Sequence, residues 1–316
     1  MNLHHDEVRK QRSTLAVCPS AKENVCVTDI LYEIIEKETY KKDYYVTITL
    51  KALAEKTKDM VFKGGTSLTK CYQLLDRFSE DIDLSYTAES GMPGESRKKQ
   101  LKNNIVSTME EFGFPINNLE TTRSRRNYNC YRASYPSFYE QNGILKPELV
   151  IETYVAMLPF PTTKRMVDNY IYRFLSEINR LDLAETYELM PFKITTQTIE
   201  RTLVDKVFAL CDYYMQEKTE RHSRHLYDIH KIVETMGISN ELPNLIPEVR
   251  AVRSEMIVCP SAKEGVCVAD ILREIINSQV YKRDYEDITM GLLFVPVGYE
   301  TVIQSLQKVL DSGMWE

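Results

Sequence analysis

The chain has 316 residues, of which 43% are hydrophobic and 27% charged, and its formal net charge is −6. That length can bury a full core or hold two domains, and the composition is that of a globular protein. The negative charge argues against a dedicated nucleic-acid binder, which is usually basic overall or on one face. The sequence has no apolar run of about 18 residues and no signal-peptide core, and its seven cysteines are an odd number. Together these features predict a reduced, cytoplasmic protein without a membrane span.

A short strand, a glycine turn and a helix are predicted in succession after residue 59. Residues 60–62 form a short apolar run bounded by glycine, as a buried strand does. Gly64 and Gly65 lack a Cβ, so the backbone can turn there and leave N–H groups open to a ligand. Thr66 or Ser67 would then cap the following helix. Amides at such a turn and helix start suit a triphosphate.

Two aspartates, one residue apart, follow on the next predicted strand. From Asp81 to Leu84 polar and apolar residues alternate, as they do in a half-buried strand. Residues two apart on a strand project from the same face, with Cα atoms roughly 6–7 Å apart. Asp81 and Asp83 can therefore hold two divalent cations for chemistry on a nucleotide phosphate. An isolated Asp-x-Asp is also compatible with a plain acidic strand end, and the glycine pair upstream favours the phosphate site.

The whole pattern predicts an α+β protein with a small mixed sheet and a mostly helical C-terminal domain. Residues 1–45 are expected to form a helical lead-in to an N-terminal domain that ends near residue 165, and residues 166–316 the second domain. Strands are also expected near 128–135 and 148–156. The expected helices cover residues 66–75, 95–112, 167–180, 198–216 and 222–236, with a last one from about residue 299.

Two of these helices carry charged residues that are candidates for phosphate chemistry. Lys206 lies one turn from Thr202, on the more polar side of its helix, where its ammonium group could reach the β- and γ-phosphates. An ordinary solvated lysine would fit that position equally well. Arg224 and Asp228 are four residues apart, so they share a helix face and can pair with each other. A local ion pair is the competing explanation for these two residues.

Four blocks of the sequence follow one another in the order and spacing of known family motifs. They span residues 63–68, 77–84, 200–210 and 224–229. These blocks resemble the AbiEii family of nucleotidyltransferase-like toxins, which belong to type IV toxin–antitoxin and abortive-infection systems and to the DNA polymerase β-like superfamily. The resemblance covers roughly residues 45–235. Asp205 stands where such sequences often carry Glu, and His225 where Asp is common, and neither change removes a group needed for catalysis.

The resemblance implies a nucleotidyltransferase core and a magnesium- or manganese-dependent transfer of a nucleoside monophosphate from a nucleoside triphosphate to an acceptor. RNA, such as a tRNA end, is the implied acceptor, and a cognate antitoxin is an implied partner. The implied catalytic residues are Asp81, Asp83, Lys206 and Asp228, and the implied substrate-binding residues are Lys63, Gly64, Gly65, Thr66, Ser67, Ser79 and Arg224. The superfamily also places a third carboxylate on a neighbouring strand. Glu152, the only acid in the strand-like run 149–155, is the candidate for this metal ligand or for the general base, with Glu148 as the alternative.

Two other functions remain compatible with these residues. A glycosyltransferase can also use an Asp-x-Asp motif, but it would need a larger donor-binding region than the sequence offers before Gly64. A nucleotide-binding interaction module would bind triphosphate without turnover, and the intact Asp81, Asp83 and Lys206 argue against it. A local cluster at Arg123, Arg125, Arg126 and Arg132, mixed with Tyr128 and Tyr131, permits an RNA acceptor, although a solvated loop and hairpin also explains it.

The sequence also contains an internal repeat. Residues 17–44 and 258–285 share 20 identities in 28 aligned positions, at a constant offset of 241. Two copies separated by the whole predicted catalytic region cannot stack as a solenoid does. The possible roles are two helical hairpins that pack on either side of the core or against each other, a dimer contact, or a four-thiolate zinc site from the Cys-x7-Cys pair of each copy. The spacing disfavours zinc, because common zinc knuckles have two to four residues between the cysteines.

Overall fold

The fold is known from a computed structural model that describes residues 38–316 except 78, 80 and 137–146. Six strands form one mixed sheet in the order β3-β4-β2-β1-β6-β5. They are β1 (Met60–Lys63), β2 (Asp81–Tyr86), β3 (Tyr128–Ser134), β4 (Glu148–Tyr154), β5 (Thr162–Val167) and β6 (Phe192–Gln197). The β2–β4 and β1–β6 pairs are parallel, and the other three pairs are antiparallel. The predicted α+β class with a mixed sheet is therefore confirmed.

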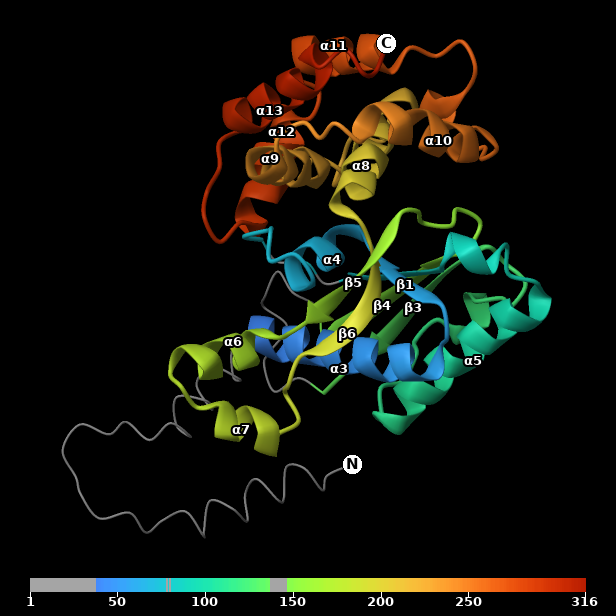
Figure 1. Ribbon diagram of the computed structural model, residues 1–316, viewed down its shortest axis with the longest axis vertical. Helices are drawn as coiled ribbons and strands as arrows, with labels where there is room; N and C mark the ends of the chain where they lie inside the picture. Colours follow the sequence, from blue (N-terminus) through green and yellow to red (C-terminus); the bar gives the residue numbers. More distant parts are fainter. Residues whose placement is uncertain (1–37, 78, 80, 137–146) are drawn as a thin grey trace, which may run out of the picture.

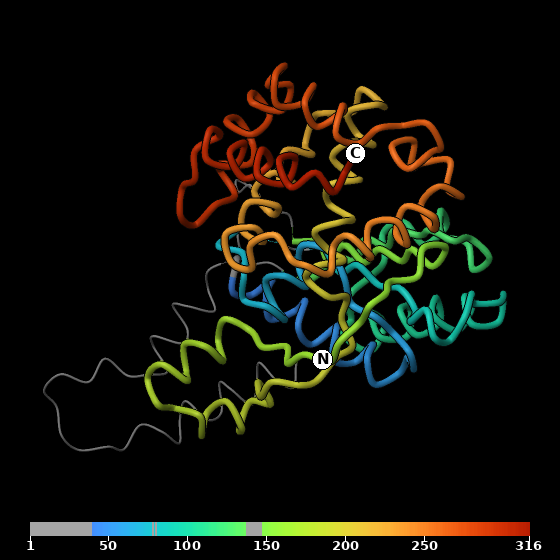
Figure 2. Tube along the Cα trace, turned by 45° about the horizontal axis from the view of Figure 1, so that its top comes forward, coloured from blue at the N-terminus to red at the C-terminus, as the bar shows by residue number. Residues whose placement is uncertain are grey.

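The helices divide between the sheet and one end of the molecule (Figure 1). Those associated with the sheet are α3 (Glu38–Lys56), α4 (Gly64–Lys70), α5 (Glu95–Glu111), α6 (Tyr170–Glu177) and α7 (Leu181–Thr186). Those gathered at the end are α8 (Ile199–Met215), α9 (Arg224–Met236), α10 (Leu242–Ser254), α11 (Val268–Ser278), α12 (Lys282–Asp284) and α13 (Tyr299–Asp311). Helices α6 and α7 project to the side of the molecule, as the turned view in Figure 2 also shows. No helix in the described part of the chain is long and apolar enough to cross a membrane.

The sheet has one buried face and one face that carries polar groups. Leu50 of α3 and Ile105 of α5 pack against Ile82, Leu84 and Ile151 in one hydrophobic core. Because neighbouring strand residues point to opposite faces, the residues between these apolar positions on β2 and β4 must face the other way. The alternation in the sequence thus places the acidic residues of both strands on the same open face. A second core joins α8 to α13 at the helical end.

The helix after the glycine turn is shorter than the sequence pattern predicted. Helix α4 begins at Gly64, ends at Lys70 and has Lys63 as its N-cap without a side-chain cap, so the expected capping by Thr66 or Ser67 is wrong. The Ser67 hydroxyl instead donates to the Gly64 carbonyl at 2.8 Å. The helix stops because Gln73 adopts a left-handed conformation, with φ of 52°, and turns the chain away.

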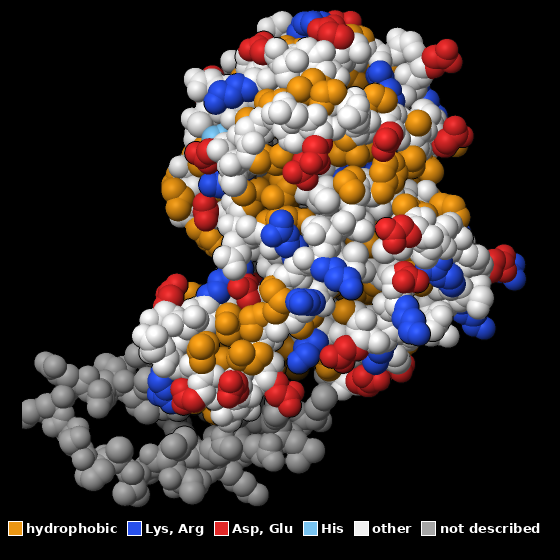
Figure 3. All heavy atoms as spheres, viewed as in Figure 1, with side chains coloured by type: hydrophobic (Ala, Val, Ile, Leu, Met, Phe, Trp, Pro, Cys, Tyr) orange, Lys and Arg blue, Asp and Glu red, His pale blue; other side chains and the backbone are white. Residues whose placement is uncertain are grey.

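Strands β5 and β6 were not predicted, and they lie on either side of the expected domain boundary. Strand β6 pairs with both β1 and β5, although it follows residue 165 in the chain. The boundary near residue 165 stays a prediction, and the sheet itself continues to Gln197. Figure 3 shows Lys and Arg side chains across the middle of one face. Lys164 and Arg165 of β5 are both exposed.

The second copy of the repeat packs against α8, and the structure describes only the last residues of the first copy. In the second copy, Ser261 donates its amide and hydroxyl to Asp212 of α8, at 2.9 and 2.6 Å. Tyr281 donates to the Leu210 carbonyl at 2.8 Å. The first copy lies outside the described residues up to residue 37, and its last residues begin α3. The zinc hypothesis stays untested, since the first-copy cysteines lie in that outside part.

Candidate active site

Strand register brings three of the predicted residues side by side. Asp83 of β2 lies opposite Glu152 of the parallel strand β4 and opposite Lys63 of the antiparallel strand β1. Asp81, two residues before Asp83, shares its face of the sheet. The structure therefore places Asp81, Asp83 and Glu152 together, whereas Glu148 lies toward the start of β4 and pairs with Arg132 at 2.9 Å.

The carboxylate of Asp83 is in an unusual electrostatic environment. Burial, together with the negative charges of Glu152 and Asp81, raises the pKa of Asp83 to about 7, against a lowering by Lys63 and Arg224. Desolvation and like charges both disfavour an ionised carboxylate. Strongly perturbed acids of this kind are typical of functional sites.

Three carboxylates that repel one another are a donor set that fits a divalent cation, because hard cations prefer oxygen ligands and would neutralise the group. In the described part of the chain, no three His, Cys, Asp or Glu side chains converge closely enough to hold one ion as they stand. The side chains of Asp81, Asp83 and Glu152 therefore have to rotate toward one another to share a cation. Glu152 is currently hydrogen-bonded by the hydroxyl of Tyr128, at 3.0 Å.

The glycine pair makes close contact with this site. Gly64 has a φ of +79°, and a Cβ on it would lie 1.9 Å from Oδ2 of Asp83. A Cβ on Gly65 would lie 2.6 Å from Nη2 of Arg77 and 3.3 Å from Oγ of Ser79. Only residues without a side chain can bring the backbone this close. Thr66 and Ser79 share a hydrogen bond of 2.8 Å between their hydroxyls.

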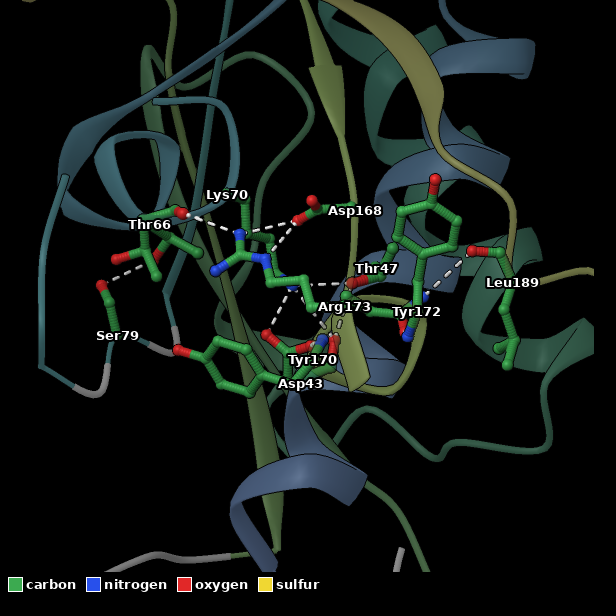
Figure 4. A network of polar contacts seen from close by, with 12 residues as sticks. Asp43, Thr47, Thr66, Lys70, Ser79, Asp168, Tyr170, Tyr172, Arg173 and Leu189 are labelled. Carbon is green, nitrogen blue, oxygen red and sulfur yellow. Dashed lines mark hydrogen bonds and ion pairs between the residues drawn. The ribbon is translucent and has the colours of Figure 1, made fainter. Parts of the chain in front are cut away.

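Helix α4 is fixed in place by a polar network at its C-terminal end (Figure 4). Lys70, at the end of α4, donates to Asp43 and to Thr47 of α3, both at 2.7 Å. Asp43 also accepts from the backbone amide of Tyr170 at 2.8 Å. Arg173 of α6 donates to the Thr69 carbonyl at 3.2 Å. The network ties the glycine turn to α3 and α6.

Asp228 lies in a buried ion-pair network that the sequence did not predict. It accepts from Arg77 at 2.7 and 2.8 Å and from Lys206 at 2.5 Å, and it is fully buried. Burial alone would raise the pKa of Asp228, but these two cations hold that pKa well below its usual range. Burial, together with the positive charge of Arg77, lowers the pKa of Lys206 despite its pairing with Asp228. Lys206 is therefore a desolvated cation beside the glycine turn.

Arg224 does not pair with Asp228, contrary to one expectation from their spacing. Its guanidinium group lies 3.7 Å from Oδ2 of Asp81, so it connects the first turn of α9 with β2. Asp228 is instead engaged by Arg77 and Lys206, which draw its side chain into the interior. Asp205, which stands where AbiEii-like sequences often carry Glu, pairs with Arg201 and with Arg253, both at 3.1 Å.

Lys63 completes the set of predicted substrate-binding residues. Its ammonium group lies 5.5 Å from the ring centre of Tyr154, within the range of a cation–π contact. Burial lowers the pKa of Lys63, although the nearby Asp83 and Asp205 raise it. Arg77 was not among the predicted site residues, although it begins the family-like block 77–84, and that position was the available signal.

The fold is shared with a known nucleotidyltransferase. The structure of MenT4, the nucleotidyltransferase toxin Rv2826c from Mycobacterium tuberculosis H37Rv, is similar to this chain with a TM-score of 0.54 and 13% identity, over 91% of this chain and 90% of that one. No curated protein sequence matches the chain significantly. The sheet and the helical end therefore have the fold of a nucleotidyltransferase toxin.

The sequence match extends this from the fold to the family. The family described as "Nucleotidyl transferase AbiEii toxin, Type IV TA system" matches residues 49–304. The chain belongs to this AbiEii family, and it is a nucleotidyltransferase toxin of a type IV toxin–antitoxin system. The resemblance inferred from the four sequence blocks is thus confirmed.

Proposed function

We propose that the protein transfers a nucleoside monophosphate from a nucleoside triphosphate to a hydroxyl group on RNA, with a tRNA end as the acceptor. The observation that carries this proposal is the carboxylate group of Asp81, Asp83 and Glu152 on adjacent strands, next to a glycine turn that only glycine can form. Family membership supports the reaction class.

The residues around the carboxylates have the chemistry that such a transfer needs. Gly64 and Gly65 admit the triphosphate against their backbone, because no side chain fills that space. Lys206 and Lys63 are desolvated cations, and binding an anionic phosphate offsets the cost of their burial. Arg224 spans from α9 to Asp81, where its charge reaches a bound phosphate. Catalysis then rests mainly on positioning and electrostatics.

Magnesium or manganese is the proposed cofactor, held by Asp81 and Asp83, and when bound it would neutralise negative charge on the phosphates. Glu152 joins these ligands or takes up a proton. The acceptor hydroxyl attacks the α-phosphorus, the bond from that phosphorus to the bridging oxygen of the β-phosphate breaks, and pyrophosphate leaves. The hydroxyl proton passes to a carboxylate of the site, for which Glu152 is the candidate.

The acceptor is proposed to approach over the open face of β3 and β4. Tyr128 is 48% exposed, lies edge-on to Tyr154 and bonds to Glu152, so its ring lies next to the reacting groups. Exposed aromatic rings are suited to stacking unpaired bases. Tyr131, by contrast, is buried on the other face, which removes it from the predicted aromatic cluster. A cognate antitoxin is the proposed regulator, and the cytoplasm is the proposed location.

The test is incubation of the purified protein with each α-labelled nucleoside triphosphate, magnesium and total cellular RNA. We expect label in a narrow RNA size class with the wild type and none with the Asp81→Ala/Asp83→Ala double variant. Triphosphate binding without any transfer to RNA, protein or small molecules would instead support a binding module. The absence of both triphosphate binding and label transfer would contradict the proposed function.

A further inference from the structure

Three aromatic rings form a nearly parallel stack where α8 and α9 meet. The Tyr213 and His222 ring centres are 3.5 Å apart with planes at 9°. The His225 ring is 5.7 Å from Tyr213 and 6.2 Å from His222, with planes at 17° and 8°. Tyr213 lies on α8, His222 in the turn before α9, and His225 in the first turn of α9. Two different segments thus contribute to one stack.

The stack lies beside the groups assigned to the phosphates. Tyr213 is seven residues after Lys206, two turns along the same face of α8. His225 directly follows Arg224, which reaches Asp81. The charges of Lys206, Arg224 and Asp228 act on the imidazole of His225, and the charge of Glu152 acts on the phenol of Tyr213. The three rings therefore lie on the elements that carry Lys206 and Arg224, within the electrostatic reach of the charged groups of the site.

Two polar atoms in this stack are buried without a protein partner. Nδ1 of His222 and Nδ1 of His225 have no hydrogen bond from any residue that the structure describes. Leaving a buried polar atom unpaired is unfavourable, so such atoms call for a ligand or a water. His230, later on the same helix α9, shows the ordinary arrangement: its Nδ1 bonds to Oγ of Ser305 at 2.8 Å.

A purely structural stack would not need these unpaired nitrogens. A phenylalanine or leucine in place of either histidine would pack as well and would leave no buried polar atom. Burial, with the positive charges of Lys206 and Arg224, also lowers the pKa of His225 well below its usual range, so this ring is neutral at physiological pH. A neutral imidazole offers one donor and one acceptor, the groups that read the edge of a nucleobase.

We propose that Tyr213, His222 and His225 form the subsite that stacks and selects the base of the nucleoside triphosphate. This inference rests on the proposed function, since it assigns the base of the same nucleotide whose phosphates bind at Gly64 and Lys206. The base stacks against this ring cluster, and the two imidazole nitrogens that no described residue bonds select among the bases.

The experiment measures equilibrium binding of the four nucleoside triphosphates and of inorganic tripolyphosphate, which has no base, in the presence of magnesium. We expect Tyr213→Leu to weaken binding of the preferred nucleotide by about 5- to 140-fold, the equivalent of 1–3 kcal/mol for stacking one base. Tripolyphosphate binding should not change. His222→Phe and His225→Phe, which keep a ring and remove the nitrogens, should reduce the difference in affinity among the four nucleotides. The matched control is Tyr214→Leu, whose hydroxyl bonds to Glu274 on the outside of α8.

The outcomes separate this subsite from the proposed function itself. Unchanged nucleotide affinity and unchanged base preference in all three variants would overturn the subsite and leave the proposed function intact. An unchanged nucleotide affinity with a raised KM for RNA would also overturn it, because the rings would then serve the acceptor. Equal loss of tripolyphosphate and nucleotide binding would assign the rings to the fold. A wild-type protein that binds neither ligand would contradict the proposed function instead.

Discussion

At the residue scale, the raised pKa of Asp83 makes the metal-free protein less stable as the pH rises. Asp83 has a pKa of about 7 in the folded protein against an ordinary value of 3.8, so its folded-state preference is for the protonated form. Its contribution to stability is present at acidic pH and is lost as the pH rises through about 7. The repulsion among the three carboxylates is the cause.

Asp83→Asn should therefore stabilise the metal-free protein more at pH 8 than at pH 5. The free energy of unfolding of the variant should exceed that of the wild type by roughly 2 kcal/mol more at pH 8 than at pH 5. Urea denaturation of both proteins at both pH values measures it, with the exposed Asp287→Asn variant as the control. An equal effect of Asp83→Asn at pH 5 and pH 8 would mean that Asp83 titrates as an ordinary aspartate.

Gly64 supplies a second prediction at this scale. Gly64→Ala should abolish binding of magnesium nucleoside triphosphate, because a Cβ would displace the Asp83 carboxylate and the residue would keep a left-handed φ. We also expect a loss of about 1–3 kcal/mol in stability from the strained backbone. Isothermal titration and thermal unfolding check both effects. Gly94→Ala is the matched control, since a Cβ there meets nothing within 4 Å, and an unaffected Gly64→Ala variant would remove the glycine turn from the site.

At the element scale, one buried carboxylate holds α9 against α8 and against the segment before β2. Asp228→Asn should destabilise the protein by about 3–5 kcal/mol, because it removes the buried negative charge that pairs with both Arg77 and Lys206. Chemical denaturation measures the change. Asp182→Asn, which breaks the exposed pair with Arg180, should leave the stability almost unchanged. Similar values for the two variants would show that the buried network does not join these elements.

The same scale separates what the sequence could predict from what it could not. The alternation on β2 and the glycine pair were sufficient to predict which face Asp81 and Asp83 share. Strand β5 has exposed polar residues along an edge, so its sequence lacks the alternation that marks a half-buried strand. The partner of Asp228 also had no local signal, because Arg77 lies 151 positions away in the chain and only the fold brings them together.

At the scale of the whole molecule, the second copy of the repeat connects the C-terminal segment to the helix that carries Lys206. Ser261→Ala should cost about 1.5–3 kcal/mol, since it removes a buried hydrogen bond to the charged Asp212, which also pairs with Arg253. Thermal unfolding of this variant beside Ser254→Ala provides the comparison, because Ser254 is half-buried and its hydroxyl donates only to the nearby Ala251 carbonyl. Equal stability of the two variants would mean that the repeat adds little to the helical end.

The sequence was sufficient to predict the fold class but not which strands belong to the sheet. The order of apolar and acidic segments indicated a mixed sheet followed by helices, and the family motifs lie in that order. The sequence did not indicate that β6 returns to the sheet after two helices, because parallel pairing with β1 is a contact between distant segments. The aromatic stack was equally hidden, since Tyr213 and the two histidines meet only when α8 and α9 pack.

The central claim is nucleotidyl transfer at Asp81 and Asp83, and the position of the transferred phosphorus tests it most directly. The same nucleoside triphosphate, labelled at either the α- or the γ-phosphorus, would be incubated with the protein, magnesium and RNA. We predict that the α label enters the RNA, that the γ label leaves in pyrophosphate, and that the Asp81→Ala/Asp83→Ala variant transfers neither. Entry of the γ label into the acceptor, or its release as free phosphate, would contradict the account.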